Sequence, residues 1–149
     1  MQISPATPSD IAALCQLLDV LFSQEAEFMP DHEAQSRGLA LIIGNPDIGH
    51  ILVARQGEAI VGMVSLLYTV STALGARVAL LEDMVVAPSA RSAGVGAKLV
   101  QHAIEAARRE GCKRITLLTD RSNESAQRFY QKHGFALSSM IPLRLFLGE

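Results

Sequence analysis

The stretch Leu80–Val100, LLEDMVVAPSARSAGVGAKLV, changes from a strand pattern to a helix pattern. Its first half is an apolar run that contains two adjacent acids, Glu82 and Asp83. After Pro88, apolar residues recur at helical spacing from Val95, and this helix is expected to end at Gly111. The next apolar run, RITLLT, reads as a strand. Val78 to Thr119 therefore predicts a strand, a helix and a second strand joined in a right-handed parallel crossover.

The same periodicity extends the prediction in both directions along the chain. The expected order of elements is β-α-α-β-β-β-α-β-α-β-β, which defines an α/β protein with a mixed sheet. Asp10 is predicted to cap the first helix. The elements are expected in MQISPATP (strand), 11–22 (helix), 29–46 (helix closed by Gly44 and Pro46), 50–55 and 59–70 (hairpin), 78–87 (strand), 95–111 (helix), 114–119 (strand), 122–134 (helix), and 135–137 and 142–147 (strands).

Bulk properties exclude several classes of protein. The chain has 149 residues, 49% of them apolar, which predicts one domain over residues 1–149 with a real core. No apolar run approaches the ~20 residues of a membrane span, and the N-terminus lacks the pattern of a signal peptide. A net charge of −2 argues against nucleic acid as a partner. Cys15 and Cys112 are expected to be free, buried thiols in a reducing cytoplasm, so a cytoplasmic protein is predicted.

The segment RSAGVGAK has the chemistry of an anion site at a helix entrance. Unpaired backbone N–H groups there carry partial positive charge, and Gly94 and Gly96 let a ligand approach the backbone. Arg91 and Lys98 add positive charge. A tight strand-to-helix turn without a ligand is the alternative. A Walker A loop and a dinucleotide fingerprint are both excluded, because Ala97 and Leu99 replace residues that these motifs require.

Two sequence motifs, in the same order and at the same spacing as in a known protein family, give this chain a family resemblance. Arg/Gln-x-x-Gly-x-Gly/Ala, directly after a V-V-x-P strand end, looks like the acyl-CoA-binding motif of the GNAT (Gcn5-related) N-acetyltransferases. About 30 residues on, NESAQRFYQKHGF resembles the second motif of this family. The resemblance is closest to the small-amine and polyamine acetyltransferases, and Ser92 departs from the glycine of many members. It implies a single-domain GNAT fold: a mixed, mostly antiparallel sheet with a splayed parallel pair and four flanking helices.

The resemblance also implies roles for matching positions. The pantetheine arm and thioester of acetyl-CoA would bind the backbone of Met84, Val85 and Val86. The pyrophosphate would lie at the helix N-terminus, on Arg91, Ser92, Ala93, Gly94, Val95, Gly96 and Ala97. The far wall of the cofactor would contact Asn123, Ser125 and Ala126, and Tyr130 would lie near the sulfur.

Acetyl transfer to an amine needs a base, a stabilised thioester oxygen and a partner for the leaving thiolate. Tyr130 is the candidate acid, with packing beside Phe129 as the alternative. Glu82 is the candidate base, or the residue that binds a cationic amine, and Asp83 is expected to be a structural acid. The alternative for both acids is a strand end that faces solvent, or an ion pair with Arg77, with no role in catalysis. No metal site is expected, because His32, His50, His102 and His133 are scattered without metal-ligand spacing.

The leading hypothesis is an acetyl-CoA-dependent N-acetyltransferase that acts directly on a primary amine of a small molecule or peptide, with no acyl-enzyme. A non-catalytic acyl-CoA-binding sensor or regulatory module is the alternative. The acceptor is expected at the first two helices, where Glu25, Glu27, Asp31 and Glu33 form an acidic stretch that would attract a cationic amine or only solvate a helix entrance. The last apolar segment, PLRLFL, is a candidate for pairing across a homodimer.

Overall fold

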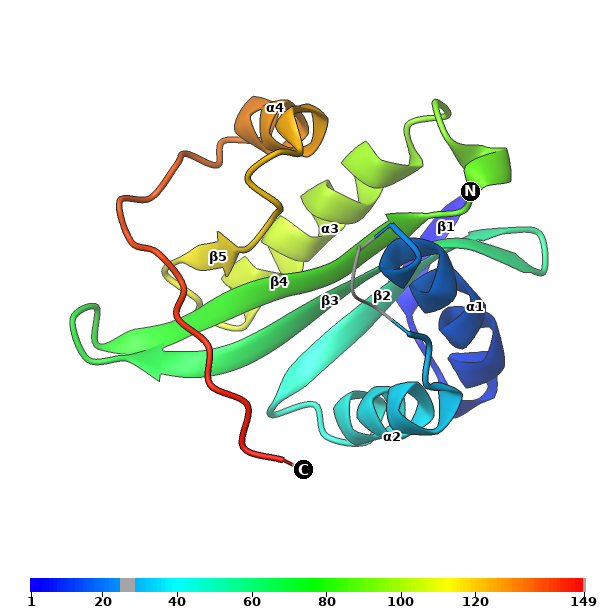
Figure 1. Ribbon diagram of the computed structural model, residues 1–149, viewed down its shortest axis with the longest axis horizontal. Coiled ribbons are helices and arrows are strands. Elements are labelled where there is room, and N and C mark those ends of the chain that lie inside the picture. Colours follow the sequence, from blue (N-terminus) through cyan, green and yellow to red (C-terminus); the bar gives the residue numbers. More distant parts are fainter. Residues whose placement is uncertain (25–28, 149) are drawn as a thin grey trace. The chain divides into compact units, whose positions relative to one another are not determined.

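A five-stranded sheet in the order β1-β2-β3-β4-β5 lies at the centre of the N-terminal part of the chain (Figure 1). The computed structural model describes residues 1–24 and 29–148. These divide into a unit from Met1 to Leu118 and a second unit from Thr119 onward. The elements are β1 (Gln2–Pro5), α1 (Ile11–Phe22), α2 (His32–Ile43), β2 (Gly49–Gln56), β3 (Ala59–Ser71), β4 (Ala76–Val86), α3 (Val95–Arg109), β5 (Ile115–Leu117) and α4 (Glu124–Lys132), with short 3-10 turns η1 (Pro8–Asp10) and η2 (Pro88–Ala90).

The pairing of the strands confirms the mixed sheet. Strands β1 to β4 pair antiparallel with their neighbours, and β4 pairs parallel with β5. The β2–β3 hairpin turns at Gly57, whose φ of 61° is a conformation that glycine adopts readily. Because β4, α3 and β5 follow one another in the chain, the parallel pair confirms the crossover connection predicted from Val78 to Thr119.

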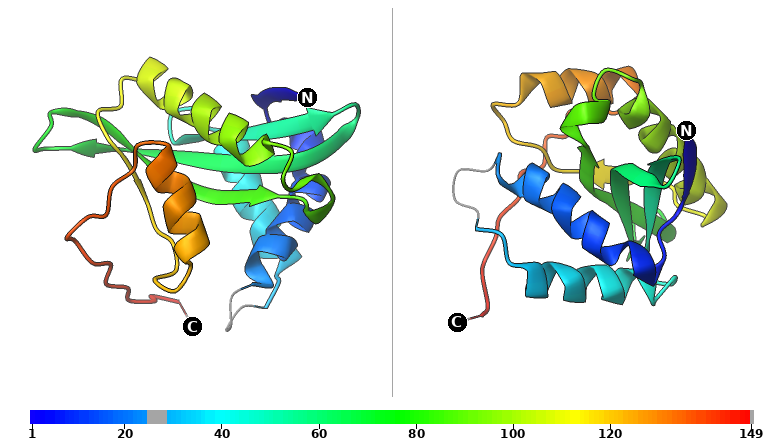
Figure 2. Two further views of the ribbon diagram at one scale, coloured as in Figure 1. Left: turned by 90° about the horizontal axis from the view of Figure 1, so that it is seen from above. Right: turned by 90° about the vertical axis from the view of Figure 1, so that its right-hand side faces the viewer.

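Helices cover both faces of this sheet. Helices α1 and α2 lie on one face and α3 on the other (Figure 2). On the α1 side the core is a cluster of buried side chains from both helices and the central strands: Leu14, Cys15, Leu17, Leu18, Leu39, Ile51, Val53, Met63 and Val85. On the α3 side the helix buries one apolar face: Val95, Leu99, Val100, Ala103, Ala106 and Ala107. The central strands are therefore packed against helices on both faces of the sheet.

Helix α3 begins and ends at glycines with left-handed backbone conformations. Gly94 is its N-cap residue at φ 79°, and Gly111 follows its C-terminus at φ 80°. The N–H groups of Gly111 and Cys112 bond the carbonyls of Arg108 and Ala107, at 3.0 and 2.9 Å, which is the Schellman arrangement. These ends match the predicted helix.

Gly49 at the start of β2 has no room for a side chain. A Cβ there would stand 2.4 Å from the carbonyl oxygen of Leu66. We expect Gly49→Ala to lower the free energy of unfolding by about 1–3 kcal/mol, because backbone atoms would have to move. Gly38→Ala in α2 is the control: nothing lies within 4 Å of its Cβ, and alanine favours a helix. Thermal melts that rank Gly49→Ala at or above the wild type would contradict this.

Asp10 occupies the N-cap position of α1, as predicted, but its carboxylate makes no capping bond to that helix. It accepts hydrogen bonds from the backbone N–H of Thr7 at 2.8 Å and from the Arg55 guanidinium at 2.6 Å. The side chain of Asp10 is 8% exposed. The carboxylate binds Arg55 on β2 and not the N-terminus of α1, because a buried carboxylate without a cation costs more free energy than a helix end without a cap.

The hydrogen bond from Arg55 holds the pKa of Asp10 below its usual range. A lowered pKa in the folded state gives stability that is present above about pH 4 and lost as the pH falls through the folded value. We expect Arg55→Met to reduce the free energy of unfolding by about 3 kcal/mol at pH 7, with the difference shrinking in acid. The exposed Arg108–Glu105 pair is the control: Arg108→Met should cost under ~1 kcal/mol at either pH. If the loss in free energy of unfolding caused by Arg55→Met were the same at all pH values, the charge of Asp10 would not be its cause.

The second unit contains α4 and a C-terminal segment without helix or strand. Residues 135–148 form no strand, so the strands predicted at 135–137 and 142–147 are wrong. Their apolar side chains favour extended structure, but a strand forms only when its backbone groups find a partner strand. None of the helices over residues 1–24 and 29–148 has the length and apolar character needed to cross a bilayer.

Candidate active site

The C-terminal half of β4 extends past its parallel partner. The β4–β5 pairing ends at Leu81 opposite Leu117, whereas β4 continues to Val86. On its other edge β4 is still paired, with Val85 opposite Met63 and Val86 opposite Gly62. The side chain of Val85 is buried. The bond from the Ala87 N–H to the Val61 carbonyl shows that alternate residues, Val85 included, turn their backbone groups to β3, so those of Met84 and Val86 face the open edge. Such a strand edge can bind an extended ligand as an added strand.

A β-bulge interrupts β4 where the acids stand. Ser65 pairs with Glu82 and Met63 with Val85, so three steps along β4 oppose two along β3. Asp83 lies inside the bulge with φ 51°, a left-handed conformation that aspartate tolerates better than most residues. The two acids therefore do not follow the simple alternation of faces that adjacent residues have in a regular strand. Bulges of this kind occur often beside active sites, where they re-aim a side chain.

The two acids differ in exposure, and Arg77 has other partners. Glu82 is exposed and Asp83 half-buried. Arg77, considered from the sequence as their ion-pair partner, contacts Glu110 at 3.3 Å and Asp47 at 4.0 Å instead. The carboxylate of Glu82 thus stands in solvent at the first residue beyond the parallel pair, where a base for the acceptor would be needed.

The loop between β4 and α3 has the expected form of an anion site. Its residues from Arg91 to Gly94 are exposed, and the first helical hydrogen bond, from Lys98 N–H to the Gly94 carbonyl, is 3.2 Å long. The backbone N–H groups at 95–97 therefore have no helical acceptor. Ser92 has φ 68°, so the residue that departs from the family glycine adopts a conformation that glycine favours, at a cost of about 1–2 kcal/mol.

The residues of the second motif lie on α4 and its N-cap in the second unit. Asn123 caps the helix, with its side-chain oxygen 3.0 Å from the Ala126 N–H. Tyr130 contacts the rings of Phe129 and Phe135, with centroids 5.2 and 5.7 Å away. Burial raises the pKa of Tyr130 to about 12, so the phenol keeps its proton at neutral pH. In the structure Asn123 caps a helix and Tyr130 packs against aromatic rings. The roles of both residues toward the cofactor stay predictions.

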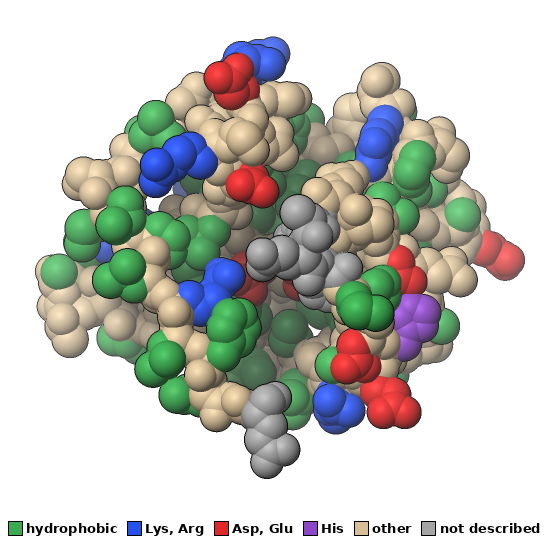
Figure 3. Space-filling view, viewed as in Figure 1, with side chains coloured by type: hydrophobic (Ala, Val, Ile, Leu, Met, Phe, Trp, Pro, Cys, Tyr) green, Lys and Arg blue, Asp and Glu red, His purple; other side chains and the backbone are tan. Residues whose placement is uncertain are grey.

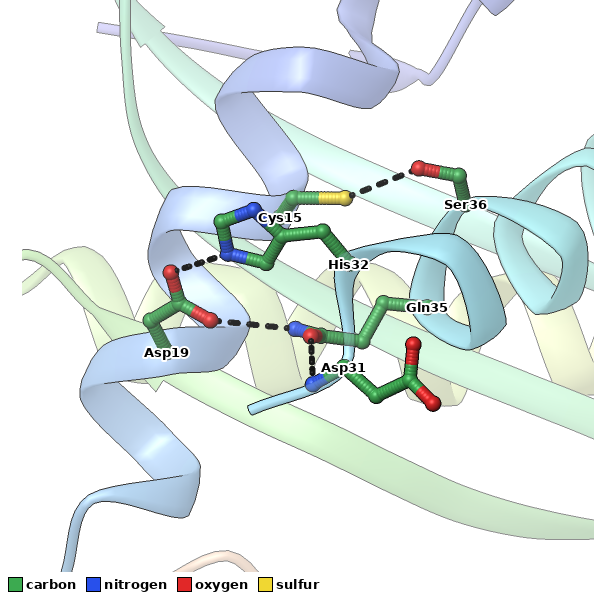
Figure 4. Close-up of polar contacts among 6 residues, drawn as sticks. All are labelled: Cys15, Asp19, Asp31, His32, Gln35 and Ser36. Atoms are coloured by element: carbon green, nitrogen blue, oxygen red, sulfur yellow. Dashed lines mark hydrogen bonds and ion pairs between the residues drawn. The ribbon is translucent and has the colours of Figure 1, made fainter. Parts of the chain in front are cut away.

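Helices α1 and α2 are joined by polar contacts. Asp19 on α1 contacts His32 Nε2 at 2.6 Å and accepts a bond from Gln35 Nε2 at 3.3 Å (Figure 4). The hydrogen bond with His32 holds the pKa of Asp19 below its usual range. Figure 3 shows acidic side chains beside a histidine over these helices. In the predicted acidic stretch, Asp31 caps α2 through the Ala34 N–H and Glu33 lies in its first turn, while Glu25 and Glu27 lie outside the described residues.

Sequence reasoning missed Ser65. It pairs with Glu82 and is 1% exposed, which places a hydroxyl beside the candidate base. The signal was one serine in the middle of the apolar run VGMVSLLY. A single serine in an apolar run does not indicate a site by itself, because its neighbour on the next strand is known only from the strand register.

The fold, a mixed sheet with one parallel pair and a helix that begins at a glycine, is that of solved acetyltransferase structures. The model of the acetyltransferase (GNAT) family matches residues 12–135, and the chain belongs to this family. It is an N-acetyltransferase, and its family uses acetyl-CoA as co-substrate.

Curated relatives and solved structures agree with this assignment. The chain is 31% identical over 138 residues to the uncharacterized N-acetyltransferase YhfO of Bacillus subtilis, covering 91% of this chain and 89% of that one. It is 28% identical over 137 residues to an aminoalkylphosphonate N-acetyltransferase of Salmonella typhimurium, covering 92% and 86%. An acetyltransferase structure from Trypanosoma brucei matches with TM-score 0.77 and 28% identity, covering 98% of this chain and 99% of the other.

Proposed function

We propose that this N-acetyltransferase moves the acetyl group of acetyl-CoA directly to a primary amine of a small molecule. The observation that carries the proposal is the end of β4 that extends past β5, together with the exposed N-terminus of α3, within a chain of the GNAT family. The backbone of 84–86 would hold the pantetheine arm, and the loop from Arg91 to Ala97 the pyrophosphate. Asn123, Ser125 and Ala126 would contact the far wall of the cofactor. In this proposal residues 1–149 act as one domain, in the cytoplasm.

The proposed chemistry needs no acyl-enzyme. Glu82 takes a proton from the acceptor ammonium, the amine nitrogen attacks the thioester carbon, and the carbon–sulfur bond breaks. The second proton that the nitrogen loses ends on the leaving thiolate, so the products are the acetamide and CoA thiol. A backbone N–H around Val85 stabilises the thioester oxygen, and Tyr130 donates a hydrogen bond to the leaving sulfur. The thiols support direct transfer: Cys15 is buried in the core, and burial raises the pKa of Cys112, which disfavours a thiolate nucleophile.

The acceptor class is proposed from two relatives. One acts on aminoalkylphosphonates. The other, 40% identical over 77 residues, is a glucosamine 6-phosphate N-acetyltransferase. Both names describe a small primary amine with a phosphorus oxyanion. We therefore place amino-phosphonates and amino-phosphates first, and polyamines, which the acidic ends of α1 and α2 would attract, second.

The test is release of CoA thiol with acetyl-CoA and a panel of amines. The panel holds aminoalkylphosphonates, glucosamine 6-phosphate, polyamines, amino acids, aminoglycosides and peptides with free N-termini. Saturable thiol release with one class, and an acetylated product of matching mass, is the expected result. Binding of acetyl-CoA without thiol release for any amine would favour the sensor alternative, and absence of binding would reject both.

A further inference from the structure

Ser65 on β3 has a hydroxyl that the fold leaves without a partner. The residue is 1% exposed, and among the described residues no group forms a hydrogen bond with its Oγ. Burying a hydroxyl without a hydrogen bond costs stability, so most buried hydroxyls have a partner. No other described side chain that is not itself exposed has a buried nitrogen or oxygen in this state. The unpaired Oγ therefore needs an explanation other than fold stability.

The strand register places this hydroxyl beside Glu82. Ser65 lies opposite Glu82 on one side and Ile51 on the other, so the three side chains share one face of the sheet. Directly opposed residues have Cβ atoms about 4.5–5.5 Å apart, within reach of a glutamate carboxylate. This pairing belongs to the unbroken β3–β4 register that runs from Ser71 opposite Ala76, and it lies one step beyond the parallel pair, which ends at Leu81.

We propose that Ser65 is a positioning residue for acetyl transfer: its Oγ–H donates a hydrogen bond to the Glu82 carboxylate, directly or through one water, when the amine is bound. This proposal rests on the proposed role of Glu82 as the base. The Ser65 proton stays on its oxygen throughout. The hydrogen bond holds the carboxylate toward the ammonium, which gives one proton to Glu82. The nitrogen then attacks the thioester carbon, the carbon–sulfur bond breaks, and the second proton of the nitrogen ends on the sulfur, which leaves as CoA thiol.

The test compares four variants with the wild type: Ser65→Ala, Ser65→Thr, Glu82→Gln and the double variant Ser65→Ala with Glu82→Gln. Thiol release is measured with the best amine of the panel, together with thermal melting. We expect Ser65→Ala to lower kcat about tenfold with KM for acetyl-CoA unchanged, the effect of losing a hydrogen bond to a charged group. Ser65→Thr restores kcat, and Ser65→Ala has no further effect in the Glu82→Gln background.

Stability distinguishes positioning from packing. Removing an unpaired hydroxyl leaves the Tm of Ser65→Ala unchanged or higher, although its turnover is lower. The proposal is overturned if Ser65→Ala turns over like the wild type, if it loses several degrees of Tm, or if it lowers kcat equally with and without Glu82. A wild-type protein that releases no thiol with any amine would refute the proposed function instead. A Glu82→Gln variant with full activity would refute the base and with it the role of Ser65, while the proposed acetyl transfer would stand.

Discussion

Replacing Tyr130 with Phe is expected to lower the turnover of acetyl transfer by about 100-fold or more, with the affinity for acetyl-CoA nearly unchanged. The phenol has a pKa of about 12, whereas a thiol titrates near ~8.5. Full proton transfer from Tyr130 to the leaving sulfur would be uphill by about 5 kcal/mol. We therefore expect Tyr130 to act as a hydrogen-bond donor that stabilises the sulfur as charge develops, an interaction made in the transition state and not in the ground state.

Tyr68 is the matched control, since the chain has 2 tyrosines and burial raises the pKa of Tyr68 to about 12 as well. Its hydroxyl contacts His50 at 2.6 Å, and it lies opposite Ala79, toward the other end of β4 from Val86. Tyr68→Phe should retain turnover. The measurements are kcat by thiol release and the Kd of acetyl-CoA by calorimetry. Unchanged turnover in Tyr130→Phe would reject its role and leave packing as the explanation.

The second large effect is expected at the entrance of α3. Gly96→Asp would place a negative charge against the pyrophosphate, where two unit charges 4 Å apart at a protein surface repel by about 4 kcal/mol. This corresponds to a loss of acetyl-CoA affinity of about a thousandfold. The reason is electrostatic, so Gly96→Ala, which matches the family motif, should bind within a few-fold of the wild type.

Calorimetry with acetyl-CoA at two salt concentrations measures this effect. Higher salt should restore part of the affinity lost in Gly96→Asp and little of any loss in Gly96→Ala. Thermal melts of both variants check that the helix is intact. Retained affinity in Gly96→Asp would show that the pyrophosphate is not bound at the N-terminus of α3.

Most elements of the first unit could be predicted because their signals are local. Pro88 and Gly94 mark the end of β4 and the start of α3, and Gly57 marks the hairpin. Apolar spacing then identifies the buried face of each helix. The glycine-rich entrance to α3 was predicted for the same reason, since an exposed helix N-terminus depends only on the residues that form it.

The errors arose where a partner distant in the sequence decides the outcome. The carboxylate of Asp10 contacts Arg55 on β2 instead of the α1 N-terminus. The apolar segment at 142–147 has strand propensity but forms no strand. The pairing of Ser65 with Glu82 depends on the register of the β3–β4 hairpin, which runs from Ser71 opposite Ala76 and which no local sequence pattern specifies.

The sequence by itself determined the α/β class, the crossover from β4 to β5, the family and the helix entrance proposed for the pyrophosphate, because these follow from periodicity, glycine conformation and motif spacing. Only the tertiary structure decided which acid stands exposed beyond the parallel pair and which hydroxyl lies beside it. The physical reason is the register of β3 against β4, which places Ser65 opposite Glu82 and depends on contacts between strands. The extra residue at Asp83 changes the face only of the residues that follow it.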